Sequence, residues 1–280
     1  MRGDCHIHMV LDGRDWKSAI TRHQAAVDMG FVRTALENYR RLGYTYLRDG
    51  GDRWGVGAAA RSLAEEYGIR YATPLAPLCK KGHYGAFIGE CFENMADFAR
   101  LVVLRRNQGA DFIKIMISGL MDFDRFGVLT EEGLTPDEIR QLVHIAHEEG
   151  FSVMAHANGA RVLEAAAAAG VDSVEHGAYP DADALHAMAE TGVIWVPTVS
   201  TVGNLMGKGR FDEKAVRAIF DRTVENVRLF HAMGGVVAPG TDAGAWAVEH
   251  GCATEEGYLA MAGVDENACQ QGIKAIMNRF

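Results

Sequence analysis

The sequence lacks any long hydrophobic run, since no apolar stretch approaches the roughly 20 residues that a membrane-spanning helix needs. It also lacks a block of lysines and arginines, and its formal net charge is −9. The basic surface typical of nucleic-acid-binding proteins is therefore not expected. The N-terminus has no basic segment followed by an apolar leader. Together these absences predict a soluble protein with neither a membrane nor a nucleic acid as partner.

Cysteine and proline are also scarce. The five cysteines are scattered, odd in number and form no CxxC pair, which favours reduced thiols in the cytoplasm. The chain has 6 prolines among 280 residues and no Ser/Pro-rich linker, so we expect residues 1–280 to form a single domain. An apolar content of 48% is ample for its core.

Short β-rich runs alternate with longer helical ones along the chain. Eight segments are predicted as strands: residues 4–9, 44–48, 70–75, 112–117, 152–156, 173–176, 194–198 and 236–240. Several of them, such as "DFIKIMI" and "GVIWVPT", are nearly continuous apolar runs, which is typical of parallel strands covered on both faces. The clearest helix lies in "TPDEIRQLVHIAHEEG", where Thr135 and Glu138 form a capping box and Gly150 ends the helix.

This alternation predicts the fold class. Eight strand–helix units in about 250 residues indicate an α/β protein built as a (β/α)8 TIM barrel. A doubly wound open sheet is the alternative that the pattern leaves open. No GxGxxG follows the first predicted strand, so the dinucleotide-binding form of the open sheet has no support.

Ionisable residues gather at the ends of the predicted strands. The first strand carries His6 and His8, and alternate residues of a strand share one face. Four further strands end near one such group each: Lys114, His156, His176 and Asp242. Barrels of this kind carry their chemistry at the C-terminal ends of the strands. Buried charges and imidazoles need partners, and a shared divalent metal site would supply them.

Each of these residues also has an ordinary structural explanation. His6 and His8 could be core histidines with satisfied hydrogen bonds, Lys114 could be ion-paired, and Asp242 could cap a loop. All of these explanations would have to hold together, which favours the metal site. The remaining helical histidines are predicted to be surface or packing residues: His23, His144, His147, His186 and His231.

The motifs resemble those of a known enzyme superfamily. "DCHIH", "GADFIKIMISG", "HANG", "AGVDSVEHG", "VPT" and "GTDAG" occur in the order seen in the amidohydrolase superfamily. The imidazolonepropionase and Xaa-Pro dipeptidase-like branch is the most similar, and the resemblance runs from about residue 4 to about residue 260. The HxH pair begins at residue 6 and the chain stops shortly after the last predicted helix. We therefore expect the small β-sandwich of relatives to be absent, and a homo-oligomer stays open.

The resemblance implies two divalent metal ions. By that similarity His6, His8 and Asp242 hold one metal. His156 and His176 hold the other. Histidine and carboxylate ligands with open positions favour zinc, while manganese, iron and nickel remain compatible with this set.

The resemblance also implies a role for Lys114. In similar enzymes the lysine of the fourth strand reacts with CO2, and the resulting carbamate bridges the two metals. The reaction needs the neutral amine, which desolvation in an apolar strand favours. Lys114 is therefore expected to be carbamylated.

The reaction implied is hydrolysis of a C–N bond by a hydroxide that bridges the two metals. Asp242 would take a proton and pass it to the leaving nitrogen. His83 in "KKGHYGAFIGE" resembles a "GGH" segment of the dipeptidase-like branch, so it is the candidate that binds substrate and stabilises the oxyanion. Tyr84, Tyr179 and His250 are further candidates for substrate binding.

The substrate is expected to be a small molecule that bears a carboxylate. A carboxylate on a dipeptide, an N-acyl amino acid or an imidazolone acid would need a cation. The candidates on or near the C-terminal loops are Arg48, Arg53, Lys80, Lys81 and Arg125. Each could equally be a solvated surface charge, because one sequence defines loops poorly.

Two other functions stay open. Hydrolysis of a lactone or another C–O bond would use the same nucleophile, and a barrel could bind metal without catalysis. The intact set of six residues argues against the second alternative. If Asp242 is not the base, Glu175 is the next candidate, although strand alternation predicts that its side chain points away from the barrel axis when His176 points inward.

Overall fold

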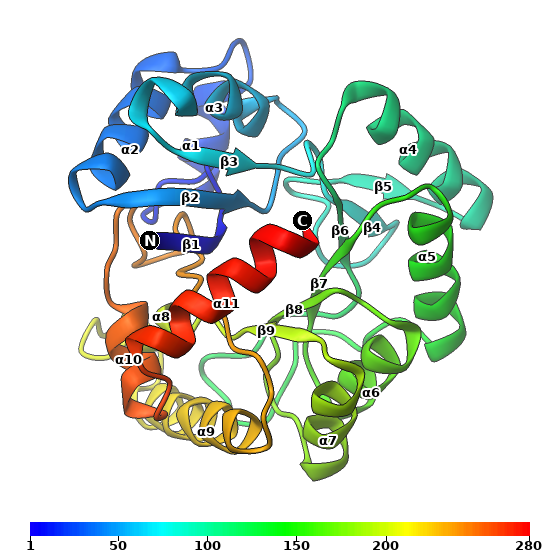
Figure 1. Cartoon of the computed structure of the whole chain (residues 1–280), viewed down its shortest axis with the longest axis vertical. Coiled ribbons are helices and arrows are strands. Elements are labelled where there is room, and N and C mark those ends of the chain that lie inside the picture. The colour runs from blue at the N-terminus through cyan, green and yellow to red at the C-terminus, as the bar shows by residue number, and fades with distance from the viewer.

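The computed structural model describes residues 1–280 and has parallel strands at its centre with helices around them (Figure 1). One sheet has the order β1 (Arg2–Ile7), β2 (Tyr44–Asp49), β3 (Arg70–Ala72). The other has the order β5 (Glu90–Phe92), β4 (Leu78–Lys80), β6 (Ile113–Met116), β7 (Val153–Ala157), β8 (Ser173–His176), β9 (Ile194–Val196). Every pairing between these strands is parallel. The predicted α/β class with parallel strands is confirmed.

Helices follow most strands and cover the outside of the sheets (Figure 1). They are α1 (Trp16–His23), α2 (Met29–Arg41), α3 (Val56–Ala64), η1 (Glu65–Tyr67), α4 (Met95–Gln108), α5 (Pro136–Glu148), α6 (Ala160–Ala169), α7 (Ala182–Thr191), α8 (Ser200–Gly203), α9 (Glu213–Ala232), α10 (Glu255–Met261) and α11 (Glu266–Arg279). Helix α5 begins with the predicted capping box, in which Thr135 and Glu138 each accept from the other's backbone N–H. A local signal in the sequence therefore sets that boundary.

The prediction of an eighth strand at 236–240 is wrong in its detail. This segment makes only an isolated bridge, between Val237 and Trp195 of β9. Pro239 has no N–H to donate, so a regular ladder cannot continue through it. The segment still lies between β9 and β1, because Trp195 N donates to Val236 O and Cys5 N donates to Pro239 O, both at 2.9 Å.

The first sheet also contacts the second one between β3 and β6. Asp111, just before β6, donates its backbone N–H to Thr73 O at 3.0 Å, and Thr73 N donates to the Asp111 carboxylate at 2.8 Å. Strands β4 and β5 lie beyond this junction, in a stretch that the sequence predicted as a loop. They are three residues long each, too short for their periodicity to be recognised.

Helix α11 lies across the middle of the strands, near both chain ends (Figure 1). It contacts the N-terminal ends of strands, since Ser152 before β7 donates to Arg279 O and Arg70 of β3 donates to Met277 O. A hydrophobic cluster beneath it takes side chains from both sheets: Cys5, Tyr46, Ala72, Phe112, Met154, Ile194, Val196, Ala238, Ile273 and Ile276. This end is filled by packing, which leaves the opposite ends of the strands for the site.

All five cysteines are free, although Cys79 of β4 and Cys91 of β5 face each other with their sulfur atoms 3.2 Å apart. No helix in the structure combines the length and the apolar character needed to cross a membrane.

Candidate active site

A cavity of about 600 Å³ opens at the C-terminal ends of the strands. Five of the six predicted metal-site side chains line it: His8, Lys114, His156, His176 and Asp242. The sixth, His6, is fully buried directly beneath, with its Nε2 3.3 Å from Nε2 of His8. The fold thus brings together six residues that are spread over 237 positions of the chain, at one end of the strands.

The tightest group within this set is His6, His8 and Asp242. Asp242 Oδ1 lies 3.5 Å from Nε2 of each histidine. Tetrahedral ligands at about 2.0–2.1 Å from a zinc ion lie about 3.3–3.4 Å from one another, so these spacings fit one metal. Asp242 Oδ1 is buried and has no hydrogen-bond partner in the protein. A cation would supply the partner that this carboxylate oxygen lacks.

The site histidines are neutral, as metal ligation requires. Desolvation by burial, helped by the charge of Lys114, lowers the pKa of His8 to about 3 and that of His156 to about 3. The same desolvation holds the pKa values of His6 and His176 well below their usual range. Four imidazoles thus offer lone pairs at neutral pH instead of competing for protons.

Lys114 is buried among these groups, with 1% of its surface exposed, and its Nζ has no hydrogen-bond partner. Desolvation lowers its pKa to about 8, although the carboxylates of Glu175 and Asp242 act in the opposite direction. A buried amine without a partner is costly in its charged form. The strand therefore holds Lys114 close to the neutral state that reaction with CO2 needs.

His156 and His176 form a second pair, with ring centroids 4.7 Å apart. The Nε2 of His156 lies 3.1 Å from the carbonyl oxygen of Gly119, which leaves Nδ1 for another ligand. The Nδ1 of His176 lies 2.7 Å from the Thr198 hydroxyl, which leaves Nε2. The rings of His6 and His176 are 5.1 Å apart, so the two groups adjoin.

Three residues around the site adopt left-handed backbone conformations that are rare for non-glycine residues: His176 (φ 67°), Thr198 (φ 48°) and Asp242 (φ 57°). Each such conformation costs on the order of 1–3 kcal/mol and persists only where its surroundings hold it. The Asp242 N–H donates to His6 O at 2.7 Å, and the carboxylate of Asp4 accepts from both N and Oγ1 of Thr241. Strand β1 thus positions both its own histidines and Asp242.

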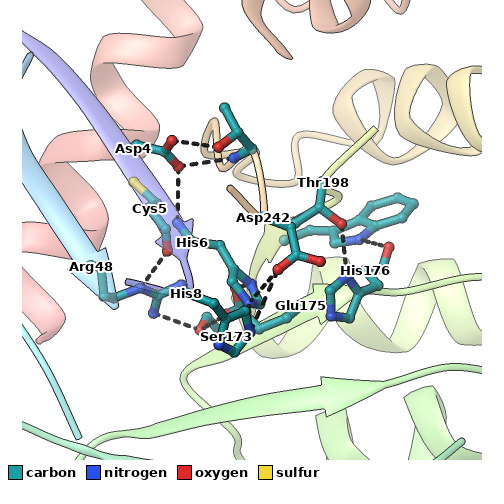
Figure 2. A network of polar contacts seen from close by, with 12 residues as sticks. Asp4, Cys5, His6, His8, Arg48, Ser173, Glu175, His176, Thr198 and Asp242 are labelled. Carbon is teal, nitrogen blue, oxygen red and sulfur yellow. Dashed lines mark hydrogen bonds and ion pairs between the residues drawn. The ribbon is translucent and has the colours of Figure 1, made fainter. Parts of the chain in front are cut away.

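Glu175 corrects a prediction made from strand alternation. Its side chain was expected to point away from the site, yet it is fully buried and accepts from His6 Nδ1 at 2.7 Å (Figure 2). The backbone turns left-handed at His176, so both neighbours can face inward. The carboxylate orients the His6 ring and leaves Nε2 of that ring free toward Asp242 and His8, as carboxylates behind metal-binding histidines do.

Arg48 corrects a second prediction. It was a candidate for binding a substrate carboxylate, but it is fully buried and donates to Glu175 Oε1 at 2.8 Å, to Ser173 Oγ and to Cys5 O (Figure 2). Its charge is thereby committed to the Glu175–His6 pair. Arg48 therefore belongs to the support of the site and cannot reach a substrate.

The other four predicted cations do not line the cavity either. Lys80 pairs with Glu138, Lys81 with Glu93 and Arg125 with Asp122, while the exposed Arg53 donates to Ala86 O. None of these four residues is therefore placed to bind a substrate carboxylate inside the cavity.

Only one of the four predicted substrate-binding residues lines the cavity. Tyr84 lines the cavity, and its ring lies 4.9 Å from that of His156. His83 does not line it and has its Nδ1 3.5 Å from Glu131, while Tyr179 packs against Phe126. His250 is held away from the cavity by Leu11 O at 2.9 Å and the Tyr39 hydroxyl at 3.1 Å, and burial lowers its pKa to about 4. None of the five helical histidines, His23, His144, His147, His186 and His231, lines the cavity.

The sequence analysis gave no supporting role to the residues that hydrogen-bond behind the site side chains: Asp4, Arg48, Ser173, Thr198 and Thr241. One signal was present, because Arg48 is a charged residue inside the predicted strand 44–48. Its partner Glu175 lies 127 positions away, so no local pattern could pair them.

Glu175→Gln is expected to weaken zinc binding by about 10–100-fold, because His6 loses the carboxylate that orients it. The same change leaves Arg48 buried without a counter-charge, which should cost about 3–5 kcal/mol of unfolding free energy. Zinc titration followed by tryptophan fluorescence and urea denaturation followed by circular dichroism measure the two effects separately.

The double variant Arg48→Met/Glu175→Gln is the control, because it removes the unpaired charge. We expect it to recover stability and to keep the weakened zinc affinity. Recovery of zinc affinity together with stability would show that Glu175 acts through folding alone and does not position His6.

Comparison with known proteins identifies relatives of this chain. Residues 4–272 match the amidohydrolase family. The ochratoxinase of Aspergillus niger is 26% identical over 299 aligned positions, which cover 91% of this chain and 60% of that protein. This chain therefore spans about three fifths of the length of that curated relative.

Solved structures share the fold. A Xaa-Pro dipeptidase with bound methionine in its active site superposes with a TM-score of 0.77 at 22% identity, over 99% of this chain and 75% of the other. The structure of A. niger ochratoxinase gives a TM-score of 0.77 at 22% identity, over 98% of this chain and 69% of the other. At this level of identity the likeness concerns the fold.

Proposed function

Because this chain belongs to the amidohydrolase family, we propose that it is a metal-dependent hydrolase that cleaves the C–N bond of a small amide, peptide or cyclic amide. One observation carries the proposal. His6 Nε2, His8 Nε2 and the unpartnered Oδ1 of Asp242 converge at the floor of the cavity, beside the unpartnered amine of Lys114. Buried groups of this kind need a common ligand, and a divalent cation is the one that suits them.

The residues divide between two metal ions in this proposal. His6, His8 and Asp242 would hold one ion. His156 and His176 would hold the other, through Nδ1 and Nε2 respectively. Bound metal supplies Lewis-acid activation of water and of the scissile carbonyl group. Zinc suits the ligand types.

Lys114 completes the set as a carbamate. Its neutral amine would attack CO2 to form a C–N bond and release one proton, and the product is a carboxylate in place of an ammonium group. That carboxylate would sit between the two groups of histidines. Its negative charge would replace a positive charge that opposes metal binding.

Asp242 would move the proton during turnover. In the metal-free protein, burial raises its pKa to about 8, and an adjacent cation acts in the opposite direction to keep it ionised. Its carboxylate faces the cavity, where it can accept a proton from water and deliver it to the leaving nitrogen. Tyr84 and the apolar wall of the cavity would exclude other water from the reacting groups.

We also infer that β1–β3, β6–β9 and segment 236–240, eight strand segments in all, form one closed (β/α)8 barrel within a single domain of residues 1–280. The backbone bonds at Thr73–Asp111, Trp195–Val236 and Cys5–Pro239 support closure. The hydrophobic cluster under α11, which draws on both sheets, supports it as well. The cytoplasm suits the free thiols.

Metal content is the first test of the proposed function. Protein purified without chelators is expected to carry about two divalent metal ions per chain and to lose them with its activity on dialysis against a chelator. Inductively coupled plasma mass spectrometry measures the metal content. A screen of the metal-loaded protein against dipeptides, N-acyl amino acids and lactones measures the activity.

His8→Ala should lower the metal content, whereas His186→Ala, at an exposed position of α7, should not. A preparation free of transition metal that still hydrolyses its substrate would refute the metal-dependent mechanism. One metal per chain, lost in His8→Ala and kept in His176→Ala, would refute only the second site. Turnover of lactones alone would make the protein a C–O hydrolase.

A further inference from the structure

Aromatic side chains make up half of the hydrophobic lining of the cavity. Six aromatic side chains line it: Trp16, Tyr84, Phe87, Phe123, Phe211 and Trp246. Phe211 lies between Phe123, at 5.3 Å between ring centroids, and Trp246, at 6.2 Å. A wall of this kind favours a large, flat or apolar group over a short polar one.

Four cationic side chains line the same cavity, and they differ in their partners: Arg14, Lys17, Lys114 and Arg210. Arg14 donates to Glu249 at 2.9 Å, and Lys114 belongs to the metal site. Lys17 is exposed on α1, with its ammonium 5.5 Å from the ring centroid of Trp16. Arg210 makes no ion pair in the structure, and its guanidinium stacks on two aromatic rings.

The stacking gives Arg210 a defined place. Its guanidinium carbon lies 4.3 Å from the ring centroid of Trp246 and 5.3 Å from that of Phe211. Contacts to the ring faces leave the N–H groups at the guanidinium edge available, and that edge matches the two oxygens of a carboxylate. An ammonium such as that of Lys17 offers no comparable planar match.

Hydrogen bonds hold the segment that carries Arg210 on both sides. The carboxylate of Glu213 accepts from the N–H groups of Gly207 and Gly209 at 3.0 and 3.1 Å. The N–H of Asp212 donates to Asp124 at 2.8 Å. These bonds hold the turn between α8 and α9 against the segment that carries Phe123, so Arg210 is presented to the cavity from an anchored turn.

We propose that Arg210 determines specificity by binding the free carboxylate of an amide substrate whose neighbouring aromatic or bulky apolar group packs on Trp246 and Phe211. The inference rests on the proposed function and names its substrate class: an anionic N-acyl amino acid or dipeptide with a large apolar side chain. None of the cations nominated from the sequence can take this role, because they lie outside the cavity or are committed to other carboxylates.

The test compares N-benzoyl-L-phenylalanine with its carboxamide, which differ in the free carboxylate. The wild type is expected to bind the acid about 10–100-fold more tightly, as a charge-assisted pair would provide. Arg210→Gln should bring the two dissociation constants together, and Arg210→Lys should recover part of the difference. Binding is measured by isothermal titration calorimetry on metal-loaded protein. To prevent turnover, both compounds are used as analogues in which a methylene linkage replaces the scissile amide.

Two matched controls locate the effect. Lys17→Gln removes the exposed lysine of the cavity wall, which makes no ion pair, and Arg217→Gln removes an exposed arginine of α9 that pairs with Asp221. Both should keep the preference for the acid. Loss of the preference in Lys17→Gln, or its persistence in Arg210→Gln, would overturn the assignment to Arg210.

Kinetics separates this inference from the proposed function. With hydrolysable N-benzoyl amino acids, Arg210→Gln should raise KM for the acid by about 10–100-fold and leave kcat within about threefold. Hydrolysis by the wild type with equal KM for acid and carboxamide would refute the role of Arg210 and keep the hydrolase. An acid preference that depends on Arg210, without hydrolysis of any amide by metal-loaded protein, would support the binding site and refute the proposed reaction.

Discussion

Replacement of Asp242 by asparagine is expected to lower kcat by about 10²–10⁴-fold, the usual worth of general acid–base assistance. The variant retains the shape of the side chain and loses the proton acceptor. The position has a φ of 57°, which asparagine tolerates better than most residues, and the anchoring bond runs from the backbone N–H to His6 O. The loss should therefore reflect chemistry and not a displaced loop.

Metal occupancy in Asp242→Asn should fall much less than kcat, because the amide oxygen can still ligate and His6 and His8 remain. Metal analysis and steady-state kinetics on the same preparation measure both quantities. Asp137→Asn, which alters an exposed carboxylate of α5, serves as the matched control and should leave both unchanged.

The pH dependence gives a second readout for Asp242. A general base works only when deprotonated, so kcat of the wild type should fall as pH drops through the pKa of its base. Burial raises the pKa of Asp242 to about 8 without metal, and a bound cation shifts it downward, so the acidic limb should lie below pH 8. Asp242→Asn should lose this limb. A variant with near-normal kcat and an unchanged limb would show that another group is the base.

Glu175 would not be that group in the observed geometry. It is fully buried, accepts from His6 and is paired with Arg48. It does not line the cavity, so no substrate atom in the cavity meets it.

Lys114→Ala is expected to lose most of its bound metal and to lower kcat/KM by more than about 100-fold. This loss is larger than the about 10–100-fold that usually follows mutation of a residue hydrogen-bonded to a metal ligand. The variant removes the group that would become the bridging carboxylate. It also opens space at the floor of the cavity, because the Lys114 side chain lines it. Acetate or propionate can enter that space and supply a carboxylate, so both should partly restore metal content and activity.

Rescue distinguishes the carbamate from a plain amine. Acetate should restore activity in Lys114→Ala, whereas methylamine should not, and bicarbonate should promote metal loading of the wild type only. Lys81→Ala, at an exposed lysine paired with Glu93, controls for general effects of charge removal. Rescue by primary amines with no response to acids or bicarbonate would mean that Lys114 acts as an amine.

Several features of this protein were determined by local sequence. The alternation of apolar runs and amphipathic stretches predicted the parallel α/β architecture, and β8 spans the predicted residues 173–176. The period of two along a strand predicted that His6 and His8 share a face, and both lie at the site. The capping box predicted the start of α5. These signals are local because they depend on backbone geometry over a few residues.

Other features depended on the tertiary structure. Alternation failed at Glu175, because the left-handed backbone at His176 allows both side chains to face the site. The regular eighth strand failed at Pro239, which has no N–H to donate. His83 and His250 stay out of the cavity because Glu131, Leu11 and Tyr39 hold them elsewhere.

Arg48 and Arg210 show most directly why the sequence alone could not identify the residue that binds a substrate. Both have the same side chain, and the sequence nominated the first and passed over the second. Arg48 is neutralised by Glu175, 127 positions away, whereas Arg210 stacks on Trp246 in a cavity wall without a carboxylate partner. The availability of a charge depends on what faces it across the fold, and chain neighbours carry no information about that. Local sequence thus determined the framework and the histidines, lysine and aspartate that gather at the cavity, while long-range packing decided which charges remain free for a substrate.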